Sequence, residues 1–278
     1  MKYTGNDVSV LMSVYKNTRL DEFCDAVRSV MSEQSMPPLE LIIVIDGPIS
    51  DELEQSIMLL DKRKVNVVKL PVNRGLSYAL NEGLKLAKTE LIARMDSDDI
   101  SSSDRFEKQV NAFNLNSNLS VYGGSVLEFQ KTIEDANTKR IMPESDLEIR
   151  KLLRFRSPFN HPTVMFKTQL IKENNGYLAM GNLEDYFLWA RLSLIPNVEF
   201  GNSTDVFVNM RAGENLYKRR GSLAYIKSFF TFRKWMFQHN IISLSEMITG
   251  LIINTSVSFL PVKLRKTIYV LFLRQKIE

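Results

Sequence analysis

Four short apolar runs, separated by amphipathic segments, fill the first hundred residues and constrain the fold more than any other feature. The runs are rich in β-branched residues, as buried parallel strands are. The segments between them repeat apolar residues every three or four positions, which is the spacing of a helix. The runs are Val8–Val14, Leu39–Asp46, Val65–Leu70 and Glu90–Asp96, and the segments are 19–34, 50–63 and 75–87. This alternation predicts β-α-β units around a mainly parallel sheet.

Beyond residue 100 the pattern loosens into a mixture of helices and strands. The 278 residues, 44% of them hydrophobic, suffice for one large globular domain, or for one domain with a tail. We expect helices at 103–116 and 145–154 and from Glu184, strands at 119–129, at 205–210 and after His161 and Pro162, and only helices over 222–278.

Charge is distributed unevenly along the chain, although the total is only +4. Residues 211–278 hold 12 Lys and Arg and 3 Asp and Glu, a net charge of +9, which leaves 24 basic and 29 acidic residues, a net charge of −5, in residues 1–210. An acidic body with a basic tail indicates two different kinds of partner. The polar start, Met1–Asp7, gives no sign of a cleavable secretory signal.

Three carboxylates follow the fourth apolar run directly. Ligands of such sheets bind at the carboxyl ends of the strands, where Asp96, Asp98 and Asp99 are expected. Two carboxylates about 5 Å apart repel by roughly 3 kcal/mol at an effective dielectric constant near 20, so the cluster must be solvated or hold a cation. Oxygen ligands suit Mg²⁺ or Mn²⁺. The alternative is a capped turn before the next helix, with Ser102 or Ser103 as its N-cap.

Two further segments carry candidate functional groups. At 73–83 a strand-to-helix turn offers Arg74 and free backbone amides to a phosphate. At 183–189 Glu184 and Asp185 precede an apolar helical run, where one of them can act as a general base. Acids in a first helical turn are also ordinary partners of the helix dipole.

Several enzyme classes lack their motifs in this chain. A single cysteine, Cys24, excludes an intrachain disulfide, and two histidines, His161 and His239, exclude a zinc site built from several histidines. The glycine fingerprints of P-loop ATPases and nicotinamide enzymes do not occur, and neither does the G-x-S-x-G elbow of serine hydrolases.

Taken together, the motifs resemble those of the inverting glycosyltransferases of family 2, which have the GT-A fold. The resemblance covers about residues 5–215 and implies a catalytic domain at 1–215, with a nucleotide-sugar half at 1–100 and an acceptor half at 101–215, followed by a helical extension at 216–278. The motifs that carry it are V-S-V-L-M-S-V-Y-K-N at 8–17, V-I-D-G-P at 44–48, N-R-G-L-S-Y-A-L-N-E-G at 73–83, A-R-M-D-S-D-D at 93–99, N-H-P-T-V-M-F at 160–166 and E-D-Y-F-L-W at 184–189.

The resemblance also implies a role for individual residues. Asp98 would bind Mn²⁺ or Mg²⁺ directly, with Asp96 nearer the sugar and ribose hydroxyls. Asp185 would deprotonate the acceptor hydroxyl, and Glu184 would support it or touch the donor sugar. His161 and Trp189 would lie on the acceptor side. The donor, a UDP-sugar, would contact Tyr15, Asp46, Arg74, Asp96, Asp98 and Arg211, with Asp46 accepting a hydrogen bond from the uracil imide.

The chain departs from the family pattern at two places. Where many members carry Arg before the second Asn of the 73–83 motif, this chain has Leu80. Where many show Arg-x-His after the strand near 205–210, Arg211 is followed by Ala212 and Gly213, so no third protein ligand of the metal can be named.

The basic tail interleaves Lys and Arg with aromatic residues at 218–235 and adds further basic residues at 263–274. Its longest uncharged run, Met247–Val262, is too short and too polar to span a bilayer. Basic and aromatic residues on helices suit the interface of an anionic membrane. A helical subdomain packed on the core with a solvated basic face is the alternative, and no motif supports a nucleic-acid partner.

The sequence therefore predicts transfer of one hexose (Glc, Gal or an N-acetyl form) from a UDP-sugar to a hydroxyl of a glycan acceptor. The resemblance and the tail imply a lipid-diphosphate-linked acceptor, in O-antigen or capsule assembly, at the cytoplasmic face of the inner membrane. A sugar nucleotidyltransferase is an alternative, but residues 14–17 lack its glycine-rich loop. A non-catalytic, membrane-associated binding module with the same fold is another.

Overall fold

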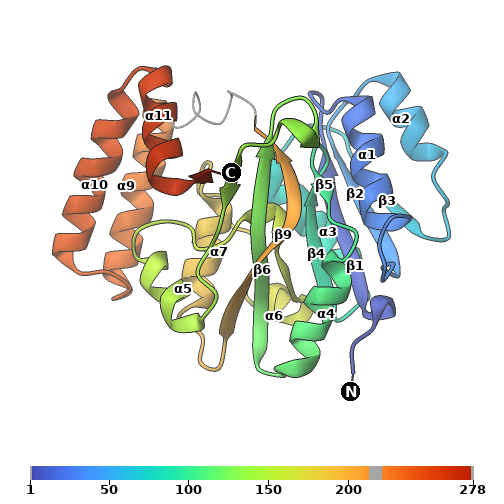
Figure 1. The fold of residues 1–278 in the computed structure, drawn as a ribbon, viewed down its shortest axis with the longest axis horizontal. Helices are drawn as coiled ribbons and strands as arrows, with labels where there is room; N and C mark the ends of the chain where they lie inside the picture. Colours follow the sequence, from blue (N-terminus) through green and yellow to red (C-terminus); the bar gives the residue numbers. More distant parts are fainter. Residues whose placement is uncertain (1, 213–220, 277–278) are drawn as a thin grey trace.

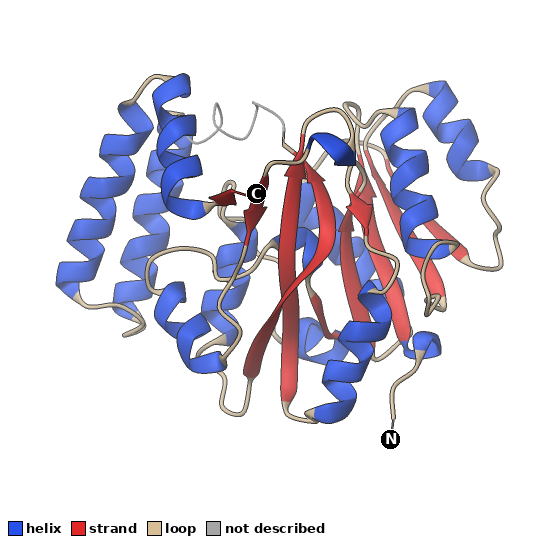
Figure 2. Ribbon diagram, in the orientation of Figure 1, coloured by secondary structure: helices blue, strands red, loops and turns tan. Residues whose placement is uncertain are grey.

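The computed structural model describes residues 2–212 and 221–276 as an α/β fold around one sheet (Figures 1 and 2). The expected alternation is confirmed in the first hundred residues. Its strands are β1 (Val8–Val14), β2 (Glu40–Asp46), β3 (Val65–Leu70) and β4 (Leu91–Asp96), and its helices are α1 (Leu20–Met31), α2 (Asp51–Met58) and α3 (Leu76–Leu86). These four strands are mutually parallel, in the order β4-β1-β2-β3.

Alternating side chains place one apolar core on each face of the sheet. Leu11 and Val44 belong to the core that α3 covers, whereas Met12 and Ile43 belong to the core under α1 and α2. Helix α3 comes close to the strands because Gly83 has no side chain, since a Cβ there would lie 2.3 Å from Cδ1 of Leu11. Strands buried on both faces explain why these runs are almost continuously apolar.

The second half of the chain adds antiparallel and mixed pairs to the sheet. Strand β8 pairs β4 and β6 antiparallel, while β9 runs parallel to β6 through several register shifts. Strand β9 starts at Glu199, earlier than predicted, and three elements were not predicted because they are too short to show a period: β5, β7 and α6. The elements are β5 (Ile100–Ser101), α4 (Arg105–Leu115), β6 (Leu119–Phe129), β7 (Thr138–Arg140), α5 (Asp146–Leu153), β8 (Met165–Lys167), α6 (Thr168–Glu173), α7 (Glu184–Leu192) and β9 (Glu199–Arg211).

The tail forms three helices, α9 (Leu223–Gln238), α10 (Leu244–Phe259) and α11 (Val262–Leu273), which lie together at one side of the sheet (Figure 1). Helix α9 packs on α7, where the rings of Tyr186 and Phe232 are 4.6 Å apart and those of Phe187 and Trp235 are 4.9 Å apart. These rings belong to the same apolar core as α3. The tail helices are therefore built onto the sheet domain.

The prediction of helices alone over 222–278 is wrong at one point. Strand β10 (Gln275–Lys276) pairs antiparallel with β7 and so extends the sheet. Just before it, Arg274 donates from Nε to Glu128 Oε2 at 2.6 Å and from Nη2 to Oε1 at 2.9 Å. A two-residue strand has no readable pattern, and the buried ion pair, not a β-pattern, holds it in place.

Within the described residues, no helix combines the length and apolarity needed to cross a bilayer. The predicted boundary between residues 215 and 216 lies outside the described residues, as do the basic residues Lys218, Arg219 and Arg220.

Candidate active site

The polar residues that follow β1, β2, β3 and β4 lie at one edge of the sheet, because these strands run parallel and in register. Ser13 pairs with Asp96, and Asp46 with Leu70. A contact of 3.4 Å between Oγ1 of Thr18 and Oγ of Ser97 joins the loops after β1 and β4. Tyr15, directly after β1, is 44% exposed at this edge.

Asp46 organises the loop between β3 and α3. Its carboxylate is buried and accepts hydrogen bonds from the backbone N–H of Arg74 at 2.7 Å and of Gly75 at 2.9 Å. Gly75 has φ 87°, which favours glycine. Two of the amides that we expected to face a phosphate, those of Arg74 and Gly75, therefore already have an acceptor. The Arg74 guanidinium is exposed and lies 3.6 Å from the ring centroid of Tyr78.

The three predicted carboxylates come together in the loop after β4. Asp96, Asp98 and Asp99 each offer an oxygen within 4.8 Å of the others. Burial, with the charge of Asp96, raises the pKa of Asp98 to about 6. Burial and the charge of Asp98 raise the pKa of Asp99 well above its ordinary value. An oxygen-only donor set whose charges repel one another suits a hard divalent cation.

The alternative explanation of this loop as a capped turn is wrong in its detail. The N-cap of α4 is Asp104, whose side chain accepts no capping hydrogen bond from the first turn, so neither Ser102 nor Ser103 caps the helix. The cluster therefore has no capping function that would account for its acids.

Arg94 is a residue of the site that our sequence reasoning missed. Its side chain is buried and forms an ion pair with Asp96, while Nε and Nη1 find no hydrogen-bond partner among the described residues. A buried guanidinium with unsatisfied N–H groups is costly, and it persists where charge is needed. The signal was present in the sequence, because Arg94 is the only charged residue inside the apolar β4 before Asp96.

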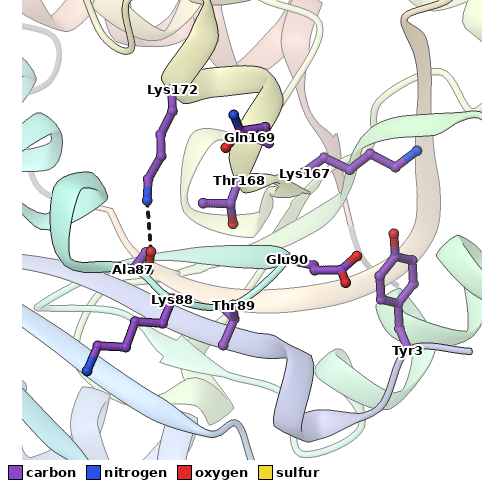
Figure 3. Close-up of a pocket in the computed structure, with 9 residues that line it drawn as sticks. All are labelled: Tyr3, Ala87, Lys88, Thr89, Glu90, Lys167, Thr168, Gln169 and Lys172. Atoms are coloured by element: carbon purple, nitrogen blue, oxygen red, sulfur yellow. Dashed lines mark hydrogen bonds between the residues drawn. The ribbon is translucent and has the colours of Figure 1, made fainter. Parts of the chain in front are cut away.

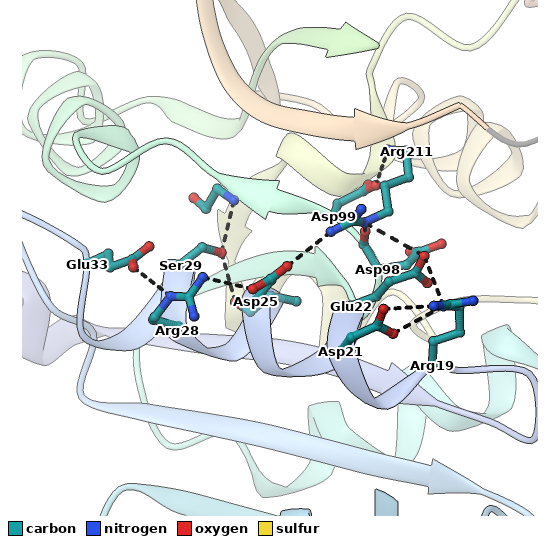
Figure 4. Close-up of polar contacts among 12 residues, drawn as sticks. Arg19, Asp21, Glu22, Asp25, Arg28, Ser29, Glu33, Asp98, Asp99 and Arg211 are labelled. Atoms are coloured by element: carbon teal, nitrogen blue, oxygen red, sulfur yellow. Dashed lines mark hydrogen bonds and ion pairs between the residues drawn. The ribbon is translucent and has the colours of Figure 1, made fainter. Parts of the chain in front are cut away.

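Arg211, at the end of β9, fastens the acidic loop to α1 (Figure 4). Its backbone N–H donates to Oδ1 of Asp99 at 2.9 Å, and its Nε donates to the carbonyl oxygen of Asp98 at 2.8 Å. Its Nη2 donates to Oδ2 of Asp25 at 3.2 Å, and its guanidinium lies 4.9 Å from the ring centroid of Phe129. Arg211, the last residue of β9, thus fixes the conformation of the acidic loop after β4.

Glu184 and Asp185 form the first turn of α7, as predicted. Oγ of Ser157 donates to Oδ2 of Asp185 at 3.2 Å. Burial raises the pKa of the Tyr177 phenol, and the charges of Asp185, Glu184 and Asp96 act in the same direction. One buried phenol therefore lies within electrostatic reach of both predicted acidic groups, the metal carboxylates and the base. Tyr177 is the second site residue that the sequence did not reveal.

His161 lies on the inner side of this region, and Trp189 packs behind it. Nε2 of His161 is 2.9 Å from the hydroxyl of Tyr177, and burial, with the charge of Arg94, lowers the pKa of His161 well below its ordinary value. Trp189 is fully buried, with its ring 5.1 Å from that of Phe159 and 6.3 Å from that of His161. Trp189 packs behind His161 and exposes no surface of its own.

The 73–83 motif has a structural explanation for its second asparagine. Asn81 accepts from the backbone N–H of Tyr177 at 2.8 Å and donates to its carbonyl at 2.7 Å. A Cβ on Gly176, which has φ 55°, would lie 2.3 Å from Oδ1 of Asn81. Leu80 is buried in the core.

A pocket of about 350 Å³ lies at the opposite edge of the sheet, where β4 begins (Figure 3). One of its lysines, Lys172, donates to the carbonyl oxygen of Ala87 at 2.8 Å. It contains none of the predicted site residues. Its lining residues are Tyr3, Ala87, Lys88, Thr89, Glu90, Lys167, Thr168, Gln169 and Lys172.

Comparison of structures supports the fold. The S. aureus TarS 1–349 structure with UDP-GlcNAc has a TM-score of 0.64 at 18% identity, covering 98% of this chain and 76% of that one. The mannosyltransferase PcManGT from Pyrobaculum calidifontis, solved with GDP-Man and Mn²⁺, has a TM-score of 0.61 at 14% identity, covering 97% and 81%. At such low identity these likenesses show the fold alone, and that fold is GT-A, as predicted.

Comparison of sequences identifies the family. The family model described as Glycosyl transferase family 2 matches residues 9–175. The chain is 33% identical over 263 residues, 94% of each chain, to a UDP-Gal:alpha-D-GlcNAc-diphosphoundecaprenol beta-1,3-galactosyltransferase of Escherichia coli. It is 32% identical over 221 residues, 79% of this chain and 82% of the other, to the amylovoran biosynthesis glycosyltransferase AmsE of Erwinia amylovora. The chain therefore belongs to glycosyl transferase family 2.

Proposed function

We propose that this glycosyltransferase moves one hexose from a UDP-sugar to a hydroxyl of a lipid-diphosphate-linked glycan, with inversion at the anomeric carbon and with a divalent cation. The observation that carries the proposal is the grouping of two acidic sets. Asp96, Asp98 and Asp99 crowd together at the carboxyl ends of the strands. The charges of Asp185 and Asp96 both raise the pKa of the buried Tyr177 phenol, whose hydroxyl lies 2.9 Å from Nε2 of His161.

The donor side is proposed at the ends of β1 to β4. Asp46 is held by two backbone amides, so its carboxylate has a fixed orientation toward which the uracil imide can donate. The exposed guanidinium of Arg74 supplies positive charge for the diphosphate, and the exposed ring of Tyr15 lies at the same edge, beside the nucleotide. Arg211 acts by holding the backbone carbonyl of Asp98 and the carboxylate of Asp99.

The carboxylates of Asp98 and Asp96 would hold Mn²⁺ or Mg²⁺. Such a cation stabilises the negative charge that grows on the leaving UDP. Asp96 is already paired with Arg94, which limits the rotation of its carboxylate. Asp98, the more exposed of the two, is the direct ligand in this proposal.

The acceptor side is proposed around α7. Asp185 takes the proton of the acceptor hydroxyl as its oxygen attacks the anomeric carbon from the face opposite the diphosphate, and this geometry inverts the anomeric configuration. Ser157 orients Asp185 through a hydrogen bond. Glu184, one residue earlier in the same turn, supports Asp185 in its role as the base. A neutral His161 and the Tyr177 hydroxyl provide polar contacts that add no further charge.

The acceptor class and the setting rest on relatives. The E. coli relative is named for a GlcNAc linked to diphosphoundecaprenol, and another E. coli relative, 33% identical over 222 residues, is named an O-antigen biosynthesis glycosyltransferase, WbnJ. We extend both points to this chain, and with them a place at the cytoplasmic face of the inner membrane. The basic tail helices fit that place.

The experiment measures UDP release from UDP-Glc, UDP-Gal and their N-acetyl forms with a GlcNAc-diphospho-lipid acceptor and Mn²⁺. We expect one donor to dominate, EDTA to stop release, and an α-linked donor to give a β-linked product by NMR. The variant Asp51→Asn, an exposed acid in the first turn of α2, serves as a control and should behave like the wild type. UDP release that ignores EDTA, or a product that retains the donor's configuration, would contradict the proposal.

A further inference from the structure

Helix α10 turns an uncharged face to the outside. Its outer residues are Leu244, Ser245, Ile248, Thr249, Ile252, Ile253, Ser256 and Phe259, and Ser258 is the only buried residue of the helix. At 100° per residue, Leu244, Ile248, Ile252 and Phe259 fall within an arc of about 80°. We call these four residues the α10 row. Ile252 is 61% exposed and Phe259 is 71% exposed, although a solvated helix normally presents charges there.

A second exposed row lies on α9, which packs against α10 (Figure 1). It mixes apolar and basic side chains, and the same helical arithmetic places them within an arc of about 80°. Phenylalanine and lysine on one helix face are typical of membrane-surface helices. The α9 row comprises Leu223, Lys227, Phe230, Lys234 and Phe237, all exposed.

The charges available around these rows are positive. The acid of the described tail helices, Glu246, is paired with Arg154 at 2.6 Å. Arg233 and Arg265 are buried and donate to backbone carbonyls, so they contribute little to the surface. The exposed charge on these helices therefore comes from lysines, as on Lys227 and Lys234. A surface that combines apolar rows with lysines complements one that combines acyl chains with anionic headgroups.

We propose that α10 and α9 form a membrane-docking surface, with the α10 row in the headgroup–acyl boundary of an anionic bilayer and the lysines of the α9 row at its phosphates. Helix α10 has 16 residues, a length of about 24 Å, which is less than the hydrocarbon thickness of about 30 Å. It therefore lies along the interface. A second copy docked symmetrically through the same surface fits less well, because it would bring lysines where the surface calls for anions.

The docking surface gives the proposed lipid-linked acceptor a route to the site. This purpose rests on the proposed function, whereas the docking itself does not. Helix α9 is anchored to α7, which carries Asp185, by the contacts of Tyr186 and Phe187 with Phe232 and Trp235. Helices that dock on a bilayer would thus hold the acceptor side at a fixed distance from the lipid headgroups.

Vesicle flotation tests the surface without donor, metal or acceptor, so its outcome is independent of glycosyl transfer. The full chain is mixed with vesicles of phosphatidylcholine alone or with one third phosphatidylglycerol. We expect the wild type to float with the anionic vesicles and the variant Ile248→Glu/Ile252→Glu to bind at least about tenfold more weakly. The matched control is Leu59→Glu/Leu115→Glu, at exposed leucines of the sheet domain, which should float like the wild type.

A second variant tests the charge. Lys227→Gln/Lys234→Gln should bind anionic vesicles several-fold more weakly and lose the dependence on salt. Thermal melting and circular dichroism check that every variant is folded. Wild-type protein that ignores anionic vesicles, or a glutamate variant that floats normally, would overturn the proposal. So would a wild-type dimer that only the glutamate variant dissociates, because the rows would then join two copies.

Discussion

The loop after β4 and the tail helices both concentrate charge, but the surroundings of the charged groups differ. In the loop, three carboxylates lie within 4.8 Å of one another and the pKa of two of them is raised. In the tail, Arg233, Arg265 and Arg274 are each fastened to carbonyls or to a carboxylate. The first arrangement is unfavourable without a ligand, whereas in the second each guanidinium donates to acceptors that the fold itself supplies. Charge left uncompensated points to function, and charge that is compensated points to folding.

The largest expected effect tests the uncompensated side of this contrast. Asp98→Ala should abolish metal-dependent UDP release, a loss of more than about 1,000-fold, because it removes the proposed direct ligand of the cation. The free energy of unfolding in EDTA should stay the same or rise, since one like charge is gone. Activity assays and denaturant titrations check both parts. A variant that is unstable yet fully active would reverse the comparison.

The second prediction concerns the other acidic set. Asp185→Asn should lower turnover by about 100- to 10,000-fold, the usual contribution of a general base. Binding of the UDP-sugar, measured by calorimetry, should change little, because Asp185 lies on the acceptor side in the proposal. The control Asp51→Asn also removes an acid from a first helical turn and should leave turnover unchanged. Equal losses in both variants would reduce Asp185 to a partner of the helix dipole.

The third prediction tests the compensated side. Arg233→Met should lower the free energy of unfolding by about 3 kcal/mol, because the carbonyls of Arg154 and Glu246 lose their buried donor. Its exposed neighbour Lys234, changed to Met, should cost less than about 0.5 kcal/mol. At a temperature where both variants are folded, UDP release should match the wild type. If the Arg233→Met variant lost turnover while its stability was unchanged, Arg233 would have a role in activity and not in folding.

The sequence predicted the sheet-edge region well because its pattern is local. The strand bounds at Val8–Val14 and Val65–Leu70 and the start of α7 at Glu184 agree with the structure. Because the strands are parallel, their carboxyl ends lie at the same edge of the sheet, and no other contact needs to be known to predict this. The placement of the three carboxylates follows from that rule alone.

What the sequence could not predict depends on contacts between distant segments. Asp46 binds the amides of the 73–75 turn, which looked free in the sequence. Tyr177 joins the site through Asn81, 96 residues away along the chain. In the tail, the net charge of +9 said nothing about burial, so Arg233 and Arg265 counted as surface charges although the structure buries them. Composition counts charges, but only the fold shows which of them meet solvent.

The smallest predicted effect is a pH dependence of stability at Asp98. Its pKa rises from 3.8 to about 6 in the folded chain, so the folded state holds this proton more tightly than the unfolded state does. The associated stability is complete below about pH 4 and is lost as the pH rises toward 6. Asp98 still reaches solvent although the loop crowds its carboxylate, so screening reduces the effect to about 1 kcal/mol.

Denaturant titrations in EDTA, at pH values between about 4 and 7, measure this term as the difference between wild type and Asp98→Asn. The stability of the variant relative to the wild type should rise by about 1 kcal/mol across that range, because only the wild type gains a repelled charge. Mn²⁺ added at neutral pH should remove the difference by binding the wild type. Parallel curves for the two proteins would mean that solvent fully screens the cluster, and the charge in the loop would then be as well compensated as the charge in the tail.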